Sequence, residues 1–192
     1  MTPGTADRPQ MPVEDFEELE RRAPETVRLE FIKGKPAVKP MPDGNHSSIL
    51  MWVLRQCMQQ RPDLNLTPKV GIKTEAHRKG RARTDAVLTP VDRFRGDGEW
   101  SDTDGILMAV EITSHDRDTD RRDRVDKPVG YAEADIPVYL LIDRGNNTLT
   151  VFSDPKDGRY QQAPTYPWGA TIEFPALIGI TLNTEKLKDY TD

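Results

Sequence analysis

The amino-acid sequence predicts an α/β (α+β) fold in which helices flank a mixed β-sheet. Two nearly continuous apolar runs, Gly105 to Thr113 and Ile136 to Asp143, are separated by a charge-rich segment that ends near Ala134. Two buried strands joined by a helical crossover form a βαβ unit, whose strands lie parallel in the centre of a sheet. With 192 residues, the chain is long enough to bury the core of one domain. We therefore expect a single domain over residues 12–192, preceded by a disordered tail over residues 1–11.

Local patterns predict the elements that precede this unit. A short helix is expected over Pro12 to Arg22, and the alternation of apolar and polar residues in Thr26 to Ile32 predicts the first strand of a β-hairpin. The apolar residues that follow His46 repeat with helical period until Pro62, and Asp43 and Asn45 are candidate caps. The sequence therefore predicts a helix, a hairpin and a longer helix in this order.

The remaining strands are predicted from apolar stretches that lie between turn signals. Strands are expected over Leu66 to Lys73 and Ala82 to Leu88, before the central unit. After that unit, short strands are expected over Thr148 to Ser153 and near Tyr160 and Thr171. Because turns separate them, these last strands indicate an antiparallel meander at one edge of the sheet.

The composition excludes several classes of protein. Lys and Arg total 27 against 32 Asp and Glu, and the net charge of -5 argues against a protein that coats nucleic acid non-specifically. One Cys and three His cannot build a tetrahedral zinc site. No run reaches the ~20 apolar residues of a membrane span, and Met1 to Gln10 lacks the apolar core of a signal peptide. We therefore expect a cytoplasmic protein that has no membrane partner.

Two acidic residues lie in predicted apolar strands. Glu111 lies inside the run GILMAVEIT, and Asp85 begins the stretch DAVL. A carboxylate in such a strand is desolvated unless it meets a cleft, a cation or hydrogen-bond donors. Two carboxylates about 5 Å apart repel by roughly 3 kcal/mol at an effective dielectric constant of about 20, so converging acids normally bind a cation or a proton. Oxygen ligands alone favour Mg²⁺ or Mn²⁺ over zinc. The alternative, a turn or salt-bridge role, is the commoner one for an acid placed like Asp85.

Four segments of the sequence share their order and spacing with a known family. They are Thr26 to His46, Arg83 to Leu88 (RTDAVL), Val110 to Ser114 (VEITS) and Asp123 to Asp143. These segments resemble the Uma family of putative restriction endonucleases, which belongs to the PD-(D/E)XK nuclease superfamily. The resemblance covers residues 12–155. It implies a restriction-endonuclease-like fold, with a mixed β-sheet core flanked by helices and with metal-binding acids on the central strands.

The resemblance also implies roles for individual residues. Glu30 would be the acid on the first long strand, near the metal or its waters, and Asp85 and Glu111 would be the metal ligands. The lysine of the superfamily normally follows the second acid by two residues, but Thr113 occupies that position here. In the Uma pattern a lysine on the following helix substitutes for it, and Lys127 matches that lysine. The implied catalytic set is therefore Asp85, Glu111, Lys127 and Glu30.

Three further residues are candidates for contact with the substrate. Pro128 disfavours α geometry at Lys127, so Arg124 is the nearest alternative cation. His46 begins a predicted helix and is a candidate for phosphate contact, with capping or packing as the alternative. Arg83 ends a basic stretch that either guides a phosphate backbone towards the acids or forms a solvated hairpin.

These observations predict a Mg²⁺- or Mn²⁺-dependent endonuclease that hydrolyses phosphodiester bonds of DNA. The alternative is a catalytically silent module that keeps the nuclease fold and binds nucleic acid or regulates a partner. RNA and branched DNA stay open as substrates, because the sequence has no aromatic stacking motif that would decide between them. A homodimer is expected by analogy with the superfamily, since two sites are the simplest means of cutting two strands.

Overall fold

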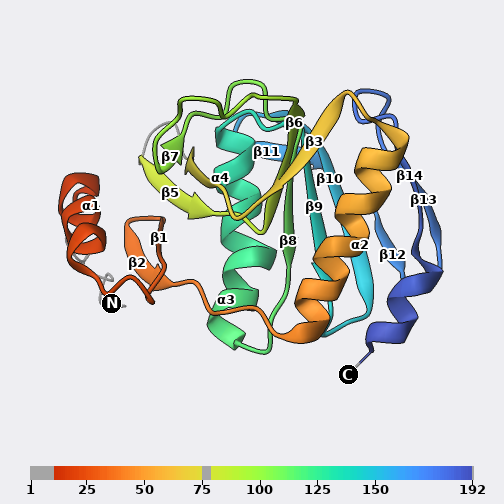
Figure 1. The fold of residues 1–192 in the computed structure, drawn as a ribbon, viewed down its shortest axis with the longest axis horizontal. Coiled ribbons are helices and arrows are strands. Elements are labelled where there is room, and N and C mark those ends of the chain that lie inside the picture. Colours follow the sequence, from red (N-terminus) through yellow and green to blue (C-terminus); the bar gives the residue numbers. More distant parts are fainter. Residues whose placement is uncertain (1–10, 75–78, 192) are drawn as a thin grey trace, which may run out of the picture.

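The computed structural model of this chain describes residues 11–74 and 79–191, and Figure 1 shows its ribbon. Apart from Met11, the predicted N-terminal tail lies outside these residues. Within the described residues, no helix is long and apolar enough to cross a lipid bilayer. The helices are α1 (Val13–Arg22), α2 (Gly44–Gln60), α3 (Arg117–Arg121), a π-helical turn (Arg122–Asp126), α4 (Lys127–Glu133) and a 3-10 helix (Thr184–Tyr190). The helices predicted near Pro12 and His46 are thus confirmed as α1 and α2.

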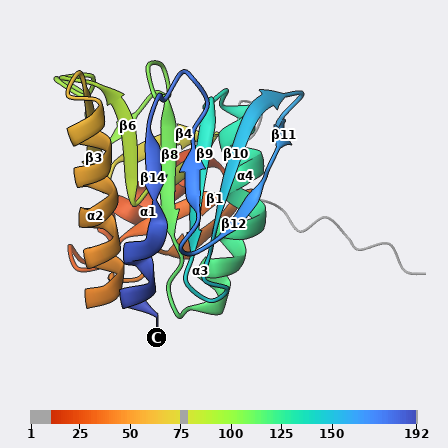
Figure 2. The same ribbon diagram turned by 90° about the vertical axis from the view of Figure 1, so that its right-hand side faces the viewer.

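The largest sheet is mixed and is seen in Figure 2 between α2 and α4. Its strand order is β11-β10-β9-β8-β6-β3, and β12 also pairs with β10. β8 and β9 are parallel, whereas the other neighbours are antiparallel. The predicted βαβ unit is therefore confirmed, because the chain passes from β8 to β9 through α3 and α4. The strands are β3 (Leu64–Pro68), β6 (Ala86–Pro90), β8 (Met108–Ile112), β9 (Val138–Asp143), β10 (Thr148–Lys156), β11 (Arg159–Gln162) and β12 (Thr165–Pro167).

A smaller sheet has the strand order β2-β1-β5-β4-β7. It contains the predicted hairpin, in which Leu29 of β1 lies opposite Val38 of β2. Of the predicted edge meander, the strands near Thr148 and Tyr160 are confirmed as the antiparallel pair β10 and β11, whereas the strand near Thr171 was wrongly included, because it pairs with β14 in a separate antiparallel hairpin. The strands of these two sheets are β1 (Leu29–Ile32), β2 (Lys35–Val38), β4 (Gly71–Thr74), β5 (Gly80–Arg83), β7 (Trp100–Ser101), β13 (Thr171–Glu173) and β14 (Thr181–Asn183).

The strands predicted over residues 66–73 and 82–88 each divide between two sheets. β3 and β6 pair in the large sheet, whereas β4 and β5 pair in the smaller one. Lys69 has a φ of 57°, in the left-handed region where a strand cannot continue. Hydrogen bonds span the break, from the Lys69 N–H to the Asp85 carbonyl (2.9 Å) and from the Thr84 N–H to the Val70 carbonyl (3.0 Å). The prediction of continuous strands is wrong here, because an unbroken apolar pattern conceals a change of sheet. Asp85 lies at this crossing.

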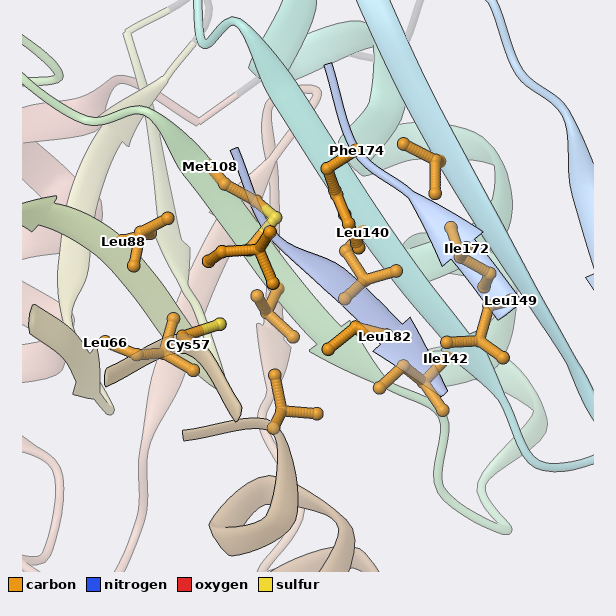
Figure 3. Close-up of a cluster of buried hydrophobic side chains, with 14 of the residues drawn as sticks. Cys57, Leu66, Leu88, Met108, Leu140, Ile142, Leu149, Ile172, Phe174 and Leu182 are labelled. Atoms are coloured by element: carbon orange, nitrogen blue, oxygen red, sulfur yellow. The ribbon is translucent and has the colours of Figure 1, made fainter. Parts of the chain in front are cut away.

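The two faces of the large sheet bury separate cores. Met108, Val110 and Ile112 of β8 join the core beneath α2, whereas Ala109 joins the core beneath α4. Because successive strand residues point to opposite faces, Glu111 faces α4 as Ala109 does. Figure 3 shows the first core, where side chains of the large sheet meet those of the β13–β14 hairpin, among them Leu140, Ile142, Leu149, Ile172 and Leu182.

The helical segment between β8 and β9, formed by α3, the π turn and α4, is called the crossover helix below. Its π turn lies immediately before Lys127. The Lys127 N–H donates to the Arg122 carbonyl, five residues back, and Lys127 has helical dihedrals of φ -66° and ψ -38°. Pro128 has no N–H, and its ring crowds the carbonyl four residues earlier in a regular α-helix. The wider π turn accommodates that ring. Lys127 therefore lies inside the helix although Pro128 follows it.

Candidate active site

Buried carboxylates from separate parts of the chain meet beneath the crossover helix. Glu111 comes from β8, Glu30 from β1, Asp85 from the crossing between β5 and β6, and Asp123 from the π turn. The exposed fraction is 6% for Asp85 and 0% for Glu30, Glu111 and Asp123. An ionised carboxylate removed from water is costly unless cations or hydrogen-bond donors surround it. The partners of these acids therefore decide what the cluster can do.

Lys127 lies at the centre of the cluster. Its Nζ is 2.9 Å from Glu111 Oε1, 3.0 Å from Asp123 Oδ1 and 3.3 Å from Glu30 Oε2. The side chain has no exposed surface. The structure therefore brings together three of the predicted catalytic residues, Lys127, Glu111 and Glu30. Lys127 Nζ donates hydrogen bonds to Glu111 Oε1 and to the Arg83 carbonyl, whereas its contacts with Glu30 and Asp123 are ion pairs.

Lys39 links the two predicted metal ligands. It follows β2, and its Nζ is 2.7 Å from Glu111 Oε2 and 3.2 Å from Asp85 Oδ1. The side chain is 14% exposed, so Lys39 lies nearer to the surface than Lys127 does. The two acids thus converge on one cation, and that cation is a lysine that the sequence did not single out.

Asp85 has two further partners besides Lys39. Its Oδ2 accepts a hydrogen bond of 2.8 Å from the Ile112 N–H and lies 3.1 Å from His46 Nε2. His46 lies in the first turn of α2, where its backbone N–H donates to the Asp43 cap. Within the described part of the chain, His46 Nδ1 has no hydrogen-bond partner. The predicted site residue His46 is therefore brought to the acids, and its contact there is Asp85.

Tyr131 and Arg122 extend the cluster on either side. The Tyr131 hydroxyl donates to Glu111 Oε1 at 2.5 Å. Arg122 Nε donates to Glu30 Oε1 at 2.9 Å, and its Nη2 donates to the Val38 carbonyl at 2.8 Å. These contacts hold the crossover helix against both β8 and the β1–β2 hairpin, so the helix fixes the positions of the acids.

The two acids that share Lys39 have opposite pKa shifts. Burial alone would raise the pKa of Asp85, but Lys39, His46 and a backbone N–H hold it well below its ordinary value. Burial raises the pKa of Glu111 to about 7, and the nearby cations Lys127 and Lys39 oppose this effect without overcoming it. Asp85 is therefore a firmly ionised carboxylate, whereas Glu111 retains a proton more readily than an ordinary glutamate.

The structure does not bring the Arg83 side chain to the acids. Its Nε donates to the Leu29 carbonyl at 2.8 Å, and its Nη2 forms ion pairs with Glu20 of α1 and with Glu99. Its guanidinium also lies over the Trp100 ring, 4.5 Å from the centroid. Arg83 therefore attaches α1 to the smaller sheet, and this geometry does not support the predicted contact with the substrate.

Arg124 is also engaged away from the acids. Its Nε and Nη2 each donate to Asp143 at 2.7 Å, and the two hydrogen bonds form a bidentate ion pair at the end of β9. Asn146 donates to the same carboxylate. Of the two cations considered from the sequence, the structure brings Lys127 to Glu111 and leaves Arg124 with Asp143.

Comparisons with known proteins identify the family. A profile of the Uma2 family, described as putative restriction endonucleases, matches residues 13–185. The chain belongs to the Uma2 family. No curated protein sequence matches it. Among solved structures, the crystal structure of a putative nuclease belonging to DUF820 from Anabaena variabilis is similar, with a TM-score of 0.72 and 19% identity over 94% of this chain and 99% of that chain. The predicted family and fold class are thus confirmed.

Thr113 has a structural role in this Uma2-family protein. Its hydroxyl accepts a hydrogen bond of 2.8 Å from the Arg144 N–H, and its own N–H donates to the Ile142 carbonyl at 2.9 Å. These bonds join the ends of β8 and β9. The residue at the position that normally carries the superfamily's lysine therefore joins two strand ends. The cations that contact Glu111 are instead Lys39 and Lys127.

Sequence reasoning missed several residues that contact the acids. Asp123, Lys127 and Tyr131 follow one another at four-residue intervals, a spacing that places side chains on one helix face and could have indicated the first and the last. Lys39 gives no such signal, because it lies in a proline-rich segment without a regular period. Its role became visible only in three dimensions.

The donor set indicates which metal the site could hold. Restriction-endonuclease-like families generally use divalent metal ions. Within residues 11–74 and 79–191, no group of three or more His, Cys, Asp or Glu side chains is arranged for a metal ion. Mg²⁺ commonly takes only one or two carboxylates and completes its shell with water and substrate phosphates. Asp85 and Glu111 therefore fit a hard ion in an open site, and such an ion would compete with Lys39 for their oxygens.

Proposed function

We propose that this protein is a divalent-metal-dependent endonuclease that hydrolyses phosphodiester bonds of DNA, with Mg²⁺ or Mn²⁺ as the ion. One observation carries the proposal. Asp85 Oδ1, from the crossing between β5 and β6, and Glu111 Oε2, from β8, converge on one cation position, now held by Lys39 Nζ at 3.2 and 2.7 Å. Membership of a family described as restriction endonucleases supports the reaction class.

The residues of the cluster divide the work in this proposal. Asp85 and Glu111 would hold the ion, which when bound would polarise the scissile phosphate and lower the pKa of a water. His46 orients Asp85 through the contact at 3.1 Å. Lys127 is a positioning residue in this proposal, because it bridges Glu111 to Glu30. It fixes the direction of Glu111 and does not itself reach the phosphate.

A groove on the surface lies next to Arg122, which contacts the cluster. This open groove, of about 620 Å³, lies between the β1–β2 hairpin and the crossover helix. Arg122 lines the groove and also donates to Glu30, so it joins the surface to the buried acids. We propose that DNA phosphates lie along this groove, and that a homodimer presents two such grooves to the two strands. Its other charged residues are Lys33, Lys35, Arg121, Asp116, Asp118 and Asp126.

Plasmid cleavage tests the proposal. Purified protein is incubated with supercoiled DNA in the presence of Mg²⁺, Mn²⁺ or EDTA. We expect nicking or linearisation that needs metal and is abolished by Glu111→Gln. Asp143→Asn is the matched control, because it also neutralises a buried strand acid but one that pairs with Arg124 outside the cluster. Metal-independent cleavage, or full activity of Glu111→Gln, would contradict the proposal.

One observation favours a second function, a catalytically silent module that binds nucleic acid. Lys39 and Lys127 already engage Asp85 and Glu111, so the acids are held together by the protein's own cations. In this case no DNA or RNA would be cleaved at millimolar Mn²⁺, while a gel-shift assay would still detect binding. Cleavage of RNA or of branched DNA alone would keep the chemistry and change the substrate.

A further inference from the structure

We propose that Lys39 is an internal counter-ion that competes with the divalent metal for Asp85 and Glu111 and must leave these acids before the metal binds. The inference rests on the proposed function, because it concerns the same metal site. Before metal arrives, Lys39 would keep the two acids close together. Its departure would set how tightly the metal is held.

The contacts of Lys39 make it a direct competitor. Its Nζ lies 2.7 Å from Glu111 Oε2, while the other oxygen of that carboxylate, Oε1, is bound by Lys127 and Tyr131. On Asp85, Lys39 contacts Oδ1, while Oδ2 is bound by the Ile112 N–H. The oxygens that remain for a metal are therefore the two that Lys39 occupies.

The charge of the cluster favours this exchange. Among the described residues, the carboxylates of Glu30, Asp85, Glu111 and Asp123 meet the lysine and arginine cations of Lys39, Lys127 and Arg122, and Asp85 also contacts the His46 ring, which this count leaves out. When all of these groups are ionised, one negative charge remains uncompensated. A divalent ion in the position of Lys39 would balance the cluster, because it brings one charge more than the ammonium does. A buried group of charges is stabilised by such compensation.

Lys39 is also the cation that has room to leave. Its side chain is 14% exposed, whereas that of Lys127 is fully enclosed. Its backbone N–H is fixed to the Arg28 carbonyl at 2.8 Å, so the main chain can stay in place while the side chain moves. The flexible four-carbon side chain of a lysine lets its ammonium group move from a partly exposed site into water. Exchange therefore needs no rearrangement of the sheet.

The first test measures Mn²⁺ affinity by titration calorimetry on wild type, Lys39→Met and Lys35→Met. If Lys39 blocks the site about nine-tenths of the time, its removal should tighten Mn²⁺ binding about tenfold, since apparent affinity scales with the open fraction. Lys35→Met is the matched control, because Lys35 is an exposed lysine of the same hairpin. It should bind Mn²⁺ as the wild type does. Equal or weaker binding by Lys39→Met would overturn the inference.

The second test uses wild-type protein and so does not depend on a variant that folds. Lysines are acylated in EDTA and at saturating Mn²⁺, and each site is quantified by mass spectrometry. Lys39 should become several-fold more reactive with Mn²⁺, while Lys35 stays reactive and Lys127 stays protected in both conditions. An unchanged Lys39 at saturating Mn²⁺ would overturn the inference.

The outcomes separate this inference from the proposed function. One outcome is that wild type and Lys39→Met bind Mn²⁺ equally well and Asp85→Asn does not bind it. That outcome supports the metal site and contradicts the proposed role of Lys39. If neither wild type nor Lys39→Met binds Mn²⁺, both fall. Tighter binding by Lys39→Met that Asp85→Asn abolishes supports both.

Discussion

Arg124 and Lys127 lie on consecutive turns of one helical segment but meet different acidic surroundings. Arg124 makes two hydrogen bonds of 2.7 Å to Asp143, and the Asn146 side chain donates a further hydrogen bond to the same carboxylate. Lys127 instead faces the carboxylates of Glu30, Glu111 and Asp123 and has no exposed surface. Arg124 forms its two short hydrogen bonds with one carboxylate, that of Asp143, and has a longer ion pair of 3.8 Å with Asp120, whereas Lys127 contacts three buried carboxylates.

This difference separates a structural ion pair from a candidate active site. In the Arg124 pair the fork of the guanidinium matches the Asp143 carboxylate, and the Asp120 carboxylate lies farther away, at 3.8 Å. In the Lys127 cluster burial raises the pKa of Glu111 and of Asp123, and repulsion from the neighbouring carboxylates adds a smaller contribution. Such an arrangement is costly for stability alone. The metal ion that we propose for this site would offset that cost.

The largest expected effect is the loss of either cation. Lys127→Met leaves buried carboxylates unpaired and should lower the free energy of unfolding by about 3–5 kcal/mol. Arg124→Met removes the main partner of Asp143, but the partly exposed position of Arg124 lets water reach the carboxylate in its place. This variant should therefore lower the free energy of unfolding by about 1–3 kcal/mol. Urea denaturation of both variants and of wild type measures these values.

Cleavage by the folded fraction of the same variants sharpens the comparison. Lys127→Met should be the less active of the two, since Lys127 positions Glu111. If Arg124→Met loses more stability and more activity than Lys127→Met, the roles assigned to the two cations are reversed.

The same substitution at one acid of each site should have unequal effects. Asp143→Asn removes an anion that accepts good hydrogen bonds, and it should lower the free energy of unfolding by about 1.5–3 kcal/mol. Within the described residues, neither oxygen of Asp123 has a hydrogen-bond donor in good geometry, and its contact is the ion pair with Lys127 at 3.0 Å. Asp123→Asn should therefore change stability by less than about 1 kcal/mol, or raise it, because the surplus negative charge is relieved. Thermal and urea unfolding of the two variants test this, and a larger loss for Asp123→Asn would contradict it.

The sequence predicted the acids of the cluster better than their partners. Glu111 was detectable because a carboxylate buried in an apolar strand is costly unless it has a cation or hydrogen-bond donors. Strand periodicity then places it beneath α4. From the predicted strands we expected that Asp85 and Glu111, if they converged, would bind a cation or a proton. The structure places Lys39 between them, from a segment that has no periodic pattern.

The directions of the basic side chains were the least predictable part of the site. Arg83 leads into Asp85 along the chain, yet its guanidinium points to α1, because the chain changes sheet between these residues. Lys127 stays in the helix despite Pro128, because a π turn precedes it. Both outcomes depend on tertiary packing, which local patterns do not encode.

The smallest expected effect is a difference in pH dependence between the two sites. Burial alone would raise the pKa of Asp143, but hydrogen bonds from Arg124 and Asn146 lower it below the ordinary 3.8. The stability that Asp143 contributes is therefore present above pH 3.8 and is lost as the pH falls through its lowered pKa. Burial raises the pKa of Asp123, so the ionised form of Asp123 weakens the fold, and protonation relieves this as the pH falls through its raised pKa.

Urea unfolding from neutral pH to about pH 2 measures both signs. The stability advantage of wild type over Asp143→Asn should shrink by about 1 kcal/mol in acid below the ordinary pKa of aspartate, because a protonated Asp143 resembles the amide. The difference between wild type and Asp123→Asn should also vanish on acidification, but there wild type gains relative to the variant, since its surplus charge is neutralised. Profiles that move in the same direction for both variants would show that the two acids are held alike, and the distinction between a balanced pair and a surplus cluster would fail.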